Sequence, residues 1–192
     1  RDVAPSRGLG DVYKRQAKKN LQRDITTYDV KAVADAGRRI WNKTLGKIVI
    51  EGGSEDEKEI FYTSLYRTYE RMINLSEDGK YYSAFDGKIH EDGGVPFYTD
   101  DWIWDTYRAT HPLRILIEPQ KELDMIRSYI RMAEQSDRRW MPTFPEVTGD
   151  SHRMNGNHAV AVIWDAYCKG LKDFDLCLLY TSPSPRDGAT SR

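Results

Sequence analysis

The sequence lacks several of the patterns by which common classes of protein are recognised. No apolar stretch approaches the roughly 20 residues that a membrane-spanning helix needs, and Gly93-Gly94 is not followed by the Lys-Ser/Thr of a phosphate-binding loop. No Gly-x-Ser-x-Gly sequence presents a nucleophilic serine. His152 and His158 are six positions apart, which is not the spacing of a zinc-binding helix. These absences argue against a membrane span, a P-loop enzyme, a serine hydrolase and a zinc enzyme built from this segment.

The two ends of the chain are related to each other at the level of DNA. One choice of codons for residues 6–16 gives a strand whose complement, read in a shifted frame, encodes residues 177–186. This relation has no cause in protein chemistry and indicates a sequencing adapter that was read on both strands. We therefore predict that residues 1–16 and 177–192 are adapter-derived artefacts, and we exclude them from the fold prediction. A natural inverted repeat is the alternative.

The composition of residues 17–176 excludes a further class of protein. The two ends carry six of the 29 Lys and Arg and three of the 30 Asp and Glu, which leaves 23 basic and 27 acidic residues and a net charge of −4. A nucleic-acid-binding protein would present a basic face instead. Cys168 is the single cysteine left, so no internal disulfide can form between these residues.

Two helices, a strand and a hairpin are predicted in the first part of the chain. Apolar residues at a spacing near 3.6 predict a helix over 29–44, and 48–50 is expected to be a short strand. Ser54 and Glu57 form a capping box, which begins a second helix. The polar, glycine-rich segment 74–95 indicates a loosely paired hairpin. The apolar stripe of the second helix consists of Phe61, Leu65, Tyr69 and Met72.

Three more helices are predicted over 99–118, 120–135 and from about 157 to 169. We expect Pro112 to bend the first of them, because proline removes a backbone donor. Residues 159–164 are apolar on every side, which is typical of a helix buried all round. Long helices with decorated loops and no repeat of fixed period predict an all-α assembly of paired helices. The core face of the second of these helices consists of Leu123, Ile126, Ile130 and Ala133.

Residues 98–108 hold the densest group of side chains suited to chemistry. On a continuous helix, Asp101, Asp105 and Arg108 would share one face, with Trp104, Arg108 and His111 on a neighbouring stripe. Carboxylates bind sugar hydroxyls in pairs, and an indole offers a flat apolar face to a sugar ring. The alternative is an ordinary ion pair of Asp105 with Arg108 beside core tryptophans.

A second polar group, residues 149–158, stands immediately before the last helix. The free backbone N–H groups of a helix start suit the binding of anions or hydroxyl oxygens. His158 and Asp165 lie two turns apart on one face. They either face a ligand or form an internal hydrogen bond, because buried polar groups need partners.

Several of these segments, in this order, resemble glycoside hydrolase family 92. The most specific piece is Trp104-Asp105-Thr106-Tyr107-Arg108 followed by His111-Pro112-Leu113. The segments 51–56, 61–66, 82–87, 96–99, 156–159 and 166–175 fit the same family. The resemblance therefore extends over nearly all of residues 17–176.

The resemblance implies a calcium-dependent exo-α-mannosidase that inverts the anomeric centre. Its family fold implies that 17–53 is a connecting helix and short strand, and that 54–176 is the N-terminal part of an (α/α)6 toroid with minor β-hairpin decoration. The substrate would be a mannose-containing glycan, and export to the periplasm or the cell exterior would be expected. By the same resemblance, Trp104 and Asp105 would line the mannose pocket, Arg108 would orient Asp105, and the loop with Arg153 and His158 would add a pocket wall.

The catalytic groups of such an enzyme are missing from this segment. The family's acid lies in a Glu-Gly-Asn motif and its base in an Asp-Asp motif near a glycine, and neither occurs in residues 17–176. The calcium ligands are likewise expected outside the fragment, so we predict that the fragment alone is inactive. Two alternatives stay open: a non-catalytic carbohydrate-binding toroid protein, and a toroid glycosidase of different sugar preference.

Overall fold

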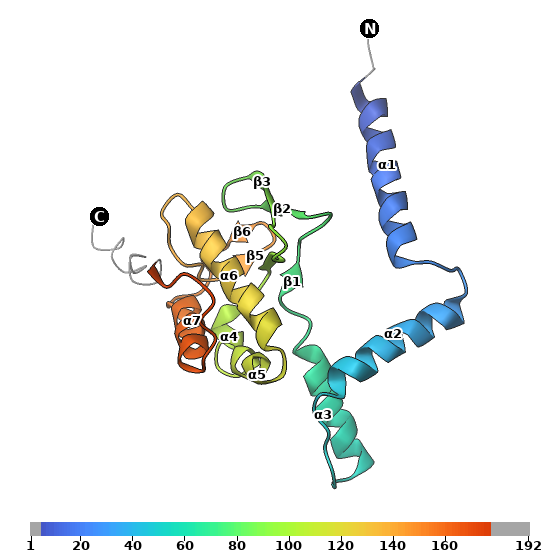
Figure 1. Ribbon diagram of the computed structural model, residues 1–192, viewed down its shortest axis with the longest axis vertical. Helices are drawn as coiled ribbons and strands as arrows, with labels where there is room; N and C mark the ends of the chain where they lie inside the picture. Colours follow the sequence, from blue (N-terminus) through green and yellow to red (C-terminus); the bar gives the residue numbers. More distant parts are fainter. Residues whose placement is uncertain (1–4, 178–192) are drawn as a thin grey trace. The chain divides into compact units, whose positions relative to one another are not determined.

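The computed structural model describes residues 5–177, and side chains from residue 14 onward. Within this range the chain forms seven helices and three two-stranded antiparallel sheets, β1–β4, β2–β3 and β5–β6 (Figure 1). It divides into two compact units, residues 1–58 and 59–192. The elements are α1 (Pro5–Asp24), α2 (Val30–Leu45), α3 (Glu55–Arg67), β1 (Ile73–Asn74), β2 (Lys80–Ser83), β3 (Lys88–Glu91), β4 (Tyr98–Thr99), α4 (Ile103–Thr106), α5 (Thr110–Ile117), α6 (Pro119–Gln135), β5 (Pro145–Glu146), β6 (Gly149–Asp150) and α7 (His158–Cys168).

The first unit consists of helices and connecting coil. α1 runs through residues 5–16, part of the segment predicted to be adapter-derived, and the C-terminal segment 177–192 lies outside the described residues except for Cys177. α2 begins as predicted, with the Asp29 carboxylate accepting from the N–H groups of Lys31 and Ala32. The predicted strand over 48–50 is wrong: this stretch is coil, and none of the three sheets within residues 5–177 includes it. A strand needs a neighbour for its backbone groups, and the local sequence cannot supply one.

The capping box that begins α3 is confirmed. Ser54 N–H donates to Glu57 Oε2 at 2.7 Å, and Glu57 N–H donates to Ser54 Oγ at 3.2 Å. The helix ends at Arg67, earlier than its apolar stripe predicted, so Tyr69 and Met72 lie beyond it. Buried Arg114 of α5 donates to the carbonyl oxygens of Thr68, at 2.7 Å, and Arg71. These backbone carbonyl groups that follow α3 are therefore bonded to a side chain of α5, and not to residues of α3.

The predicted hairpin over 74–95 is confirmed as β2 and β3, which pair antiparallel from Lys80 opposite Glu91 to Ser83 opposite Lys88. Gly87 stands in the connecting turn with a φ of 70°, a conformation that glycine adopts without cost. On the buried side of the hairpin, the Tyr81 ring stacks on Phe97 with centroids 4.1 Å apart. The hairpin is thereby attached to the core of the second unit.

The single helix predicted over 99–118 is wrong, since the chain forms β4, α4 and α5 there. Residues 107–109 separate the two helices. Pro112 lies in the first turn of α5, where its missing N–H would have had no partner in the helix. Pro112 therefore stands at the beginning of a new helix and does not bend a long one. Thr99 pairs with Ile73 in the β1–β4 sheet, a contact between distant parts of the sequence.

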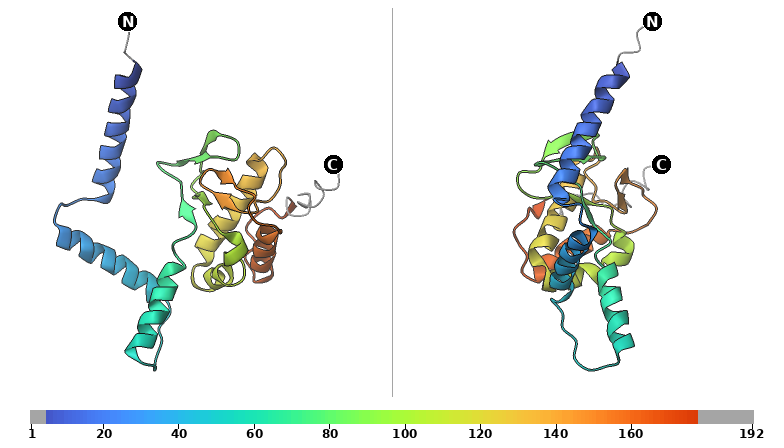
Figure 2. Two further views of the ribbon diagram at one scale, coloured as in Figure 1. Left: turned by 180° about the vertical axis from the view of Figure 1, so that it is seen from behind. Right: turned by 90° about the vertical axis from the view of Figure 1, so that its right-hand side faces the viewer.

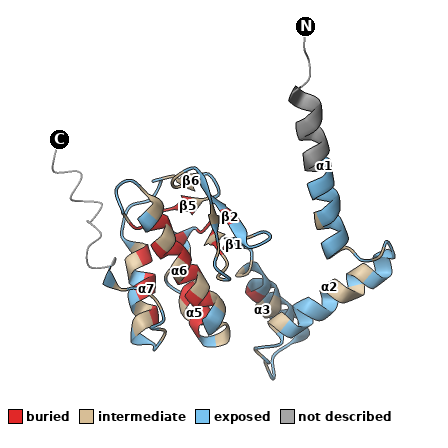
Figure 3. Ribbon diagram, turned by 45° about the horizontal axis from the view of Figure 1, so that its top comes forward, coloured by how far each residue is buried: buried red, intermediate tan, exposed pale blue. Residues whose placement is uncertain are grey.

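The core of the second unit lies where α5, α6 and α7 pack against one another, as Figures 1 and 2 show from several sides. The predicted core face of α6 is confirmed, and Figure 3 shows buried residues concentrated on these helices. The prediction that residues 159–164 are buried on every side is wrong: Ala161 is exposed and Trp164 is 46% exposed. Within residues 5–177, α7 packs through one face, which consists of Ala159, Val162, Ile163 and Ala166.

The described chain is thus helix-rich with small sheets, and not all-α in the strict sense. The β-hairpin decoration is observed. The arrangement of the helices in a ring stays a prediction. No helix among residues 5–177 is long and apolar enough to cross a membrane.

Candidate functional site

The short helix α4 presents Trp104 and Asp105 to solvent. Ile103, the first residue of the helix, is fully buried and anchors it, so the next two side chains point outward. Trp104 is 43% exposed and Asp105 is also exposed. The predicted shared face of Asp101, Asp105 and Arg108 is wrong, because Asp101 precedes α4 and Arg108 follows it. Of the predicted site residues, Trp104 and Asp105 therefore lie together on α4, as an exposed indole next to an exposed carboxylate.

Arg108 does not orient Asp105, as the family resemblance had implied. Its Nε donates to the Tyr107 hydroxyl at 2.9 Å. Its guanidinium carbon lies 5.3 Å from the centroid of the Tyr107 ring and 5.9 Å from that of Trp104. The ordinary ion pair between Asp105 and Arg108 is also absent from the described contacts. Arg108 therefore joins the two rings and leaves the Asp105 carboxylate to solvent.

His158 lies at the start of α7, against the same group of rings. Its imidazole stacks on Tyr107 with centroids 4.2 Å apart and planes inclined by 18°. Its Nε2 is buried and has no hydrogen-bond partner among the described residues. The internal hydrogen bond with Asp165 does not form, and the Asp165 carboxylate instead pairs with Lys169 at 2.5 Å. A side chain on Gly156 would collide with the imidazole, since an added Cβ would lie 2.7 Å from Nε2.

Trp104, Arg108, Tyr107 and His158 therefore form one continuous row of contacts between α4 and α7, which we call the aromatic row. The structure brings together two of the four predicted site residues in it, and Asp105 adjoins it on α4. Arg153 does not join the row: it is exposed and forms an ion pair of 3.0 Å with Glu146. No contact between Arg153 and the row is found within the described residues.

Beneath α4 lies a group of fully buried polar side chains that the sequence analysis did not predict. His111 Nδ1 lies 2.7 Å from Glu122 Oε1, and His111 Nε2 lies 3.0 Å from Asp101 Oδ2. The Tyr129 hydroxyl donates to the same Asp101 oxygen. All four side chains are fully buried, and we call them the buried network. The predicted stripe of Trp104, Arg108 and His111 is therefore wrong, because His111 lies in the interior.

The charges of the buried network support one another. Burial lowers the pKa of His111, but the carboxylates of Glu122 and Asp101 outweigh it and raise the pKa to about 9. For Asp101 burial has the opposite sign and raises the pKa. The hydrogen bonds and the charge of His111 outweigh burial and hold the pKa of Asp101 below its usual range. Burial raises the pKa of Tyr129 well above its ordinary value, and the Asp101 charge adds to this rise. At neutral pH His111 is therefore an imidazolium, Asp101 is ionised and Tyr129 is a neutral phenol.

One signal in the sequence could have revealed this network. Glu122, Ile126, Tyr129 and Ala133 follow one another at helical spacing, so Glu122 shares the core face of α6. A carboxylate on such a face needs a buried partner. The identity of that partner could not be read from the pattern, because His111 belongs to a different helix.

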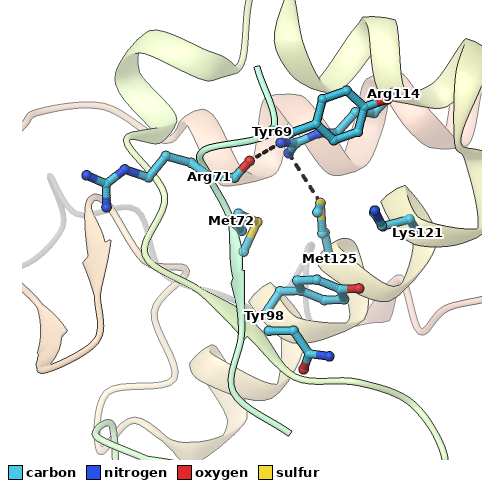
Figure 4. Close-up of a pocket in the computed structure, with 8 residues that line it drawn as sticks. Tyr69, Arg71, Met72, Tyr98, Arg114, Lys121 and Met125 are labelled. Carbon is cyan, nitrogen blue, oxygen red and sulfur yellow. Dashed lines mark hydrogen bonds between the residues drawn. The ribbon is translucent and has the colours of Figure 1, made fainter. Parts of the chain in front are cut away.

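Two pockets open elsewhere in the second unit. The first, of about 200 Å³, is drawn in Figure 4, where the guanidinium of Arg71 points away from the other labelled side chains. Arg114 Nη1 lies there 3.3 Å from Met125 Sδ, while Nη2 holds backbone carbonyls, so this guanidinium is used in structural contacts. The second pocket, of about 340 Å³, is lined by residues that include Trp140 and His152. Neither is lined by Trp104, Asp105 or His158.

The described side chains do not form a metal site of their own. Among the described residues, no group of three or more His, Cys, Asp or Glu side chains could hold a metal ion. In the buried network, the imidazole lies between the two carboxylates and hydrogen-bonds to both. The calcium ligands therefore stay expected outside this chain.

Comparison with known proteins shows what the chain is similar to. The model of the glycosyl hydrolase family 92 catalytic domain matches residues 16–184. The structure of the family GH92 inverting mannosidase BT2199 from Bacteroides thetaiotaomicron has a TM-score of 0.76 and 32% identity, and the match covers 88% of this chain and 23% of that one. For the family GH92 α-mannosidase BT3965 of the same organism the TM-score is 0.75, the identity 28% and the coverage 85% and 22%.

BT3965 has also been solved in complex with mannoimidazole, and that structure matches this chain with a TM-score of 0.76. No curated protein sequence matches the chain. The chain spans less than a quarter of the length of these mannosidases.

Proposed function

Because the chain belongs to glycosyl hydrolase family 92, we propose that it is part of a longer enzyme that removes terminal α-linked mannose from glycans. The match over residues 16–184 is the observation that carries this proposal. The named mannosidases among the similar structures, one of them with bound mannoimidazole, support the choice of sugar. Catalysis belongs to the longer protein, and the role of this chain is to bind the sugar.

The surface formed by α4 and the start of α7 has the chemistry that such binding requires. The Asp105 carboxylate is exposed and can accept hydrogen bonds from two neighbouring hydroxyls of one ring. The exposed indole of Trp104 offers an apolar face to the C–H side of the same ring and an N–H donor at its edge. His158 lies beside this surface, where its ring stacks on Tyr107, and its Nε2 is buried without a hydrogen-bond partner among the described residues. We propose that this surface faces the inside of the family's ring of helices.

The reaction we propose is inversion at the anomeric carbon, assisted by calcium. An inverting glycosidase needs a carboxylic acid and a carboxylate about 6.5–9.5 Å apart, on opposite sides of the scissile bond. We assign neither role to a residue of this chain, and the calcium ligands are proposed to lie outside it as well. The 192-residue chain alone is therefore expected to be inactive.

The test is hydrolysis of 4-nitrophenyl α-D-mannopyranoside by the longer protein, with this chain alone as the control. We expect release of nitrophenol by the longer protein only, with β-mannose as the first product by proton NMR. Activity should disappear on removal of calcium with a chelator and return when calcium is added. α-Mannose as the first product would overturn inversion, and full activity in excess chelator would overturn the calcium proposal.

A second candidate function is a carbohydrate-binding protein without catalysis. The observation in its favour is that Trp104 and Asp105 are present while the acid and base motifs are not found in residues 17–176. The same experiment separates the two candidates. Binding of mannosides by the longer protein without any hydrolysis would favour the second, and a preference for another sugar would favour a different glycosidase of this fold.

A further inference from the structure

The buried network connects three elements of the second unit. Asp101 comes from the loop before α4, His111 from α5, and Glu122 and Tyr129 from α6. Around His111 the groups that face it are these two carboxylates and the phenol, whose oxygen lies 3.2 Å from His111 Nε2. Arg114 contributes a further charge to the surroundings of Tyr129. The network therefore lies between α4, which carries Trp104 and Asp105, and the core of the unit.

Stability alone is a poor reason for such an arrangement. Taking charged groups out of water is costly for each ion, and an apolar set of the same volume is often as stable or more so. The cost is not fully offset here, because Glu122 Oε2 is buried without a hydrogen-bond partner. A buried charged network beside an exposed candidate site is better explained by the geometry that it imposes.

The geometry in question is that of α4. This helix has four residues and no side-chain hydrogen bond at its N-cap, Trp102, so local interactions alone cannot keep it formed. Both of its ends are held through Asp101. The Asp101 N–H donates to the Pro145 carbonyl at 2.9 Å, and its carboxylate accepts from Thr106 Oγ1, with both oxygens at 3.0 Å. The residues between these two attachment points include Trp104 and Asp105.

The residue before Asp101 adds a second attachment on the same side. Asp100 has a φ of 63°, in the left-handed region that residues other than glycine rarely adopt, and it is paired with Arg71. The Arg71 guanidinium lies 4.4 Å from the centroid of the Trp102 ring, and Trp102 stacks on Phe144 with centroids 6.3 Å apart. The backbone that enters α4 is thus fixed by side chains from several parts of the sequence.

We propose that Asp101, His111, Glu122 and Tyr129 are positioning residues, which through Thr106 hold α4 in the one conformation that directs Trp104 and Asp105 at the sugar. The identity of the sugar in this inference rests on the proposed function. The role of the buried network in holding α4 rests on the contacts described above. His111 is central because only an imidazolium can donate from both nitrogens, to Glu122 and to Asp101 at once. Loss of its proton or of the Thr106 hydroxyl releases α4.

The first test compares Thr106→Val, which removes the hydroxyl at nearly constant volume, with Thr106→Ser, which keeps it. In the longer protein, kcat/KM for the mannoside should fall about 10- to 100-fold in Thr106→Val, as expected when a substrate-positioning group is displaced. It should be restored in Thr106→Ser. His111→Gln should act in the same direction, and in the parent enzyme the loss should appear as pH rises through the pKa of His111, about 9. If the role were merely structural, the variants would lower the melting temperature but change kcat/KM by less than twofold at temperatures below melting. That result would overturn the proposal.

A second measurement does not depend on hydrolysis. In the 192-residue chain labelled with nitrogen-15, the indole N–H signal of Trp104 should shift or split in Thr106→Val and stay in place in Thr106→Ser. The signal of Trp164 on α7 is the internal control and should not change. An unchanged Trp104 signal in both Thr106→Val and His111→Gln would overturn the positioning role. If the parent protein hydrolyses no mannoside, the proposed function fails while this measurement still decides the positioning role.

Discussion

α2 and α6 are helices of nearly equal length, 16 and 17 residues, and both carry apolar residues at helical spacing. α6 buries nine of its residues against α5, α7 and β4, whereas α2 buries none. α2 has a strong local signal instead, the Asp29 N-cap, while Glu118 at the N-cap of α6 makes no side-chain hydrogen bond there. One helix is thus specified by its own sequence and the other is held by its neighbours.

The difference shows that periodicity predicts a helix and its apolar face, but not whether that face finds a partner. Most helical stability in proteins comes from the packing of an amphipathic face. Each of the following predictions changes one side of this contrast, beginning with the largest expected effect.

Truncation of the core face of α6 should destabilise the second unit most. Ile126 is fully buried, so Ile126→Ala should lower the free energy of unfolding by about 2–5 kcal/mol through lost burial and a new cavity. Urea denaturation followed by circular dichroism measures this. Ile126→Val is the graded control and should cost about 0.5–1.5 kcal/mol. Equal costs for the two variants would mean that the face is not packed as described.

The buried network should make the stability of the second unit depend on pH. The pKa of His111 is about 9 in the folded state, above its ordinary value of 6.5, so the folded state holds the proton more tightly. The stability that His111 contributes is complete below about pH 6.5 and is lost as the pH rises through about 9. Asp101, whose pKa is lowered, stays ionised throughout this window. Urea titrations from pH 6 to pH 9.5 should show the decline, and His111→Gln should flatten it.

Removal of the N-cap of α2 should have a moderate, local effect. Asp29→Ala leaves the N–H groups of Lys31 and Ala32 without their acceptor, which should cost α2 about 1 kcal/mol. Amide hydrogen exchange should become faster in α2 and remain unchanged in α6. Asp29→Asn retains the acceptor and serves as the matched control. The same rates in wild type and Asp29→Ala would show that the cap does not stabilise the helix.

Truncation of the apolar face of α2 should have the smallest effect. Ile40 is 66% exposed, so Ile40→Ala should change the free energy of unfolding by less than about 0.5 kcal/mol. The comparison with Ile126→Ala isolates burial, because both replace an isoleucine in a helix. A loss above about 2 kcal/mol for Ile40→Ala would show that α2 is packed in solution, and the contrast between the helices would then fail.

The sequence predicted those features of the fold that local interactions decide. The Ser54–Glu57 capping box, the hairpin of residues 80–91 and the core face of α6 were all recovered from spacing and residue type. The predicted helix over 99–118 was wrong because Thr99 is drawn into a sheet with Ile73 and the helix is interrupted at residues 107–109. Such a pairing joins residues far apart in the chain, and no local pattern records it.

The candidate site shows the same division. Trp104 and Asp105 were found as an adjacent indole and carboxylate in the motif that resembles the family, and His158 was found as a polar residue at a helix start. The contact of His158 with Tyr107 was not predicted, and Arg153 lies apart from the row. The buried network was missed because its four members are supplied by three segments that meet only on folding.

By itself, the sequence determined the family, the helix starts at Asp29 and Ser54, and which residues could bind a sugar, because these depend on residue identity and on neighbours within a few positions. The tertiary structure alone decided that α4 would be a four-residue helix with Trp104 outside and Asp101 inside. The physical reason is that a buried carboxylate must find its charge and hydrogen-bond partners, and here those partners come from α5 and α6.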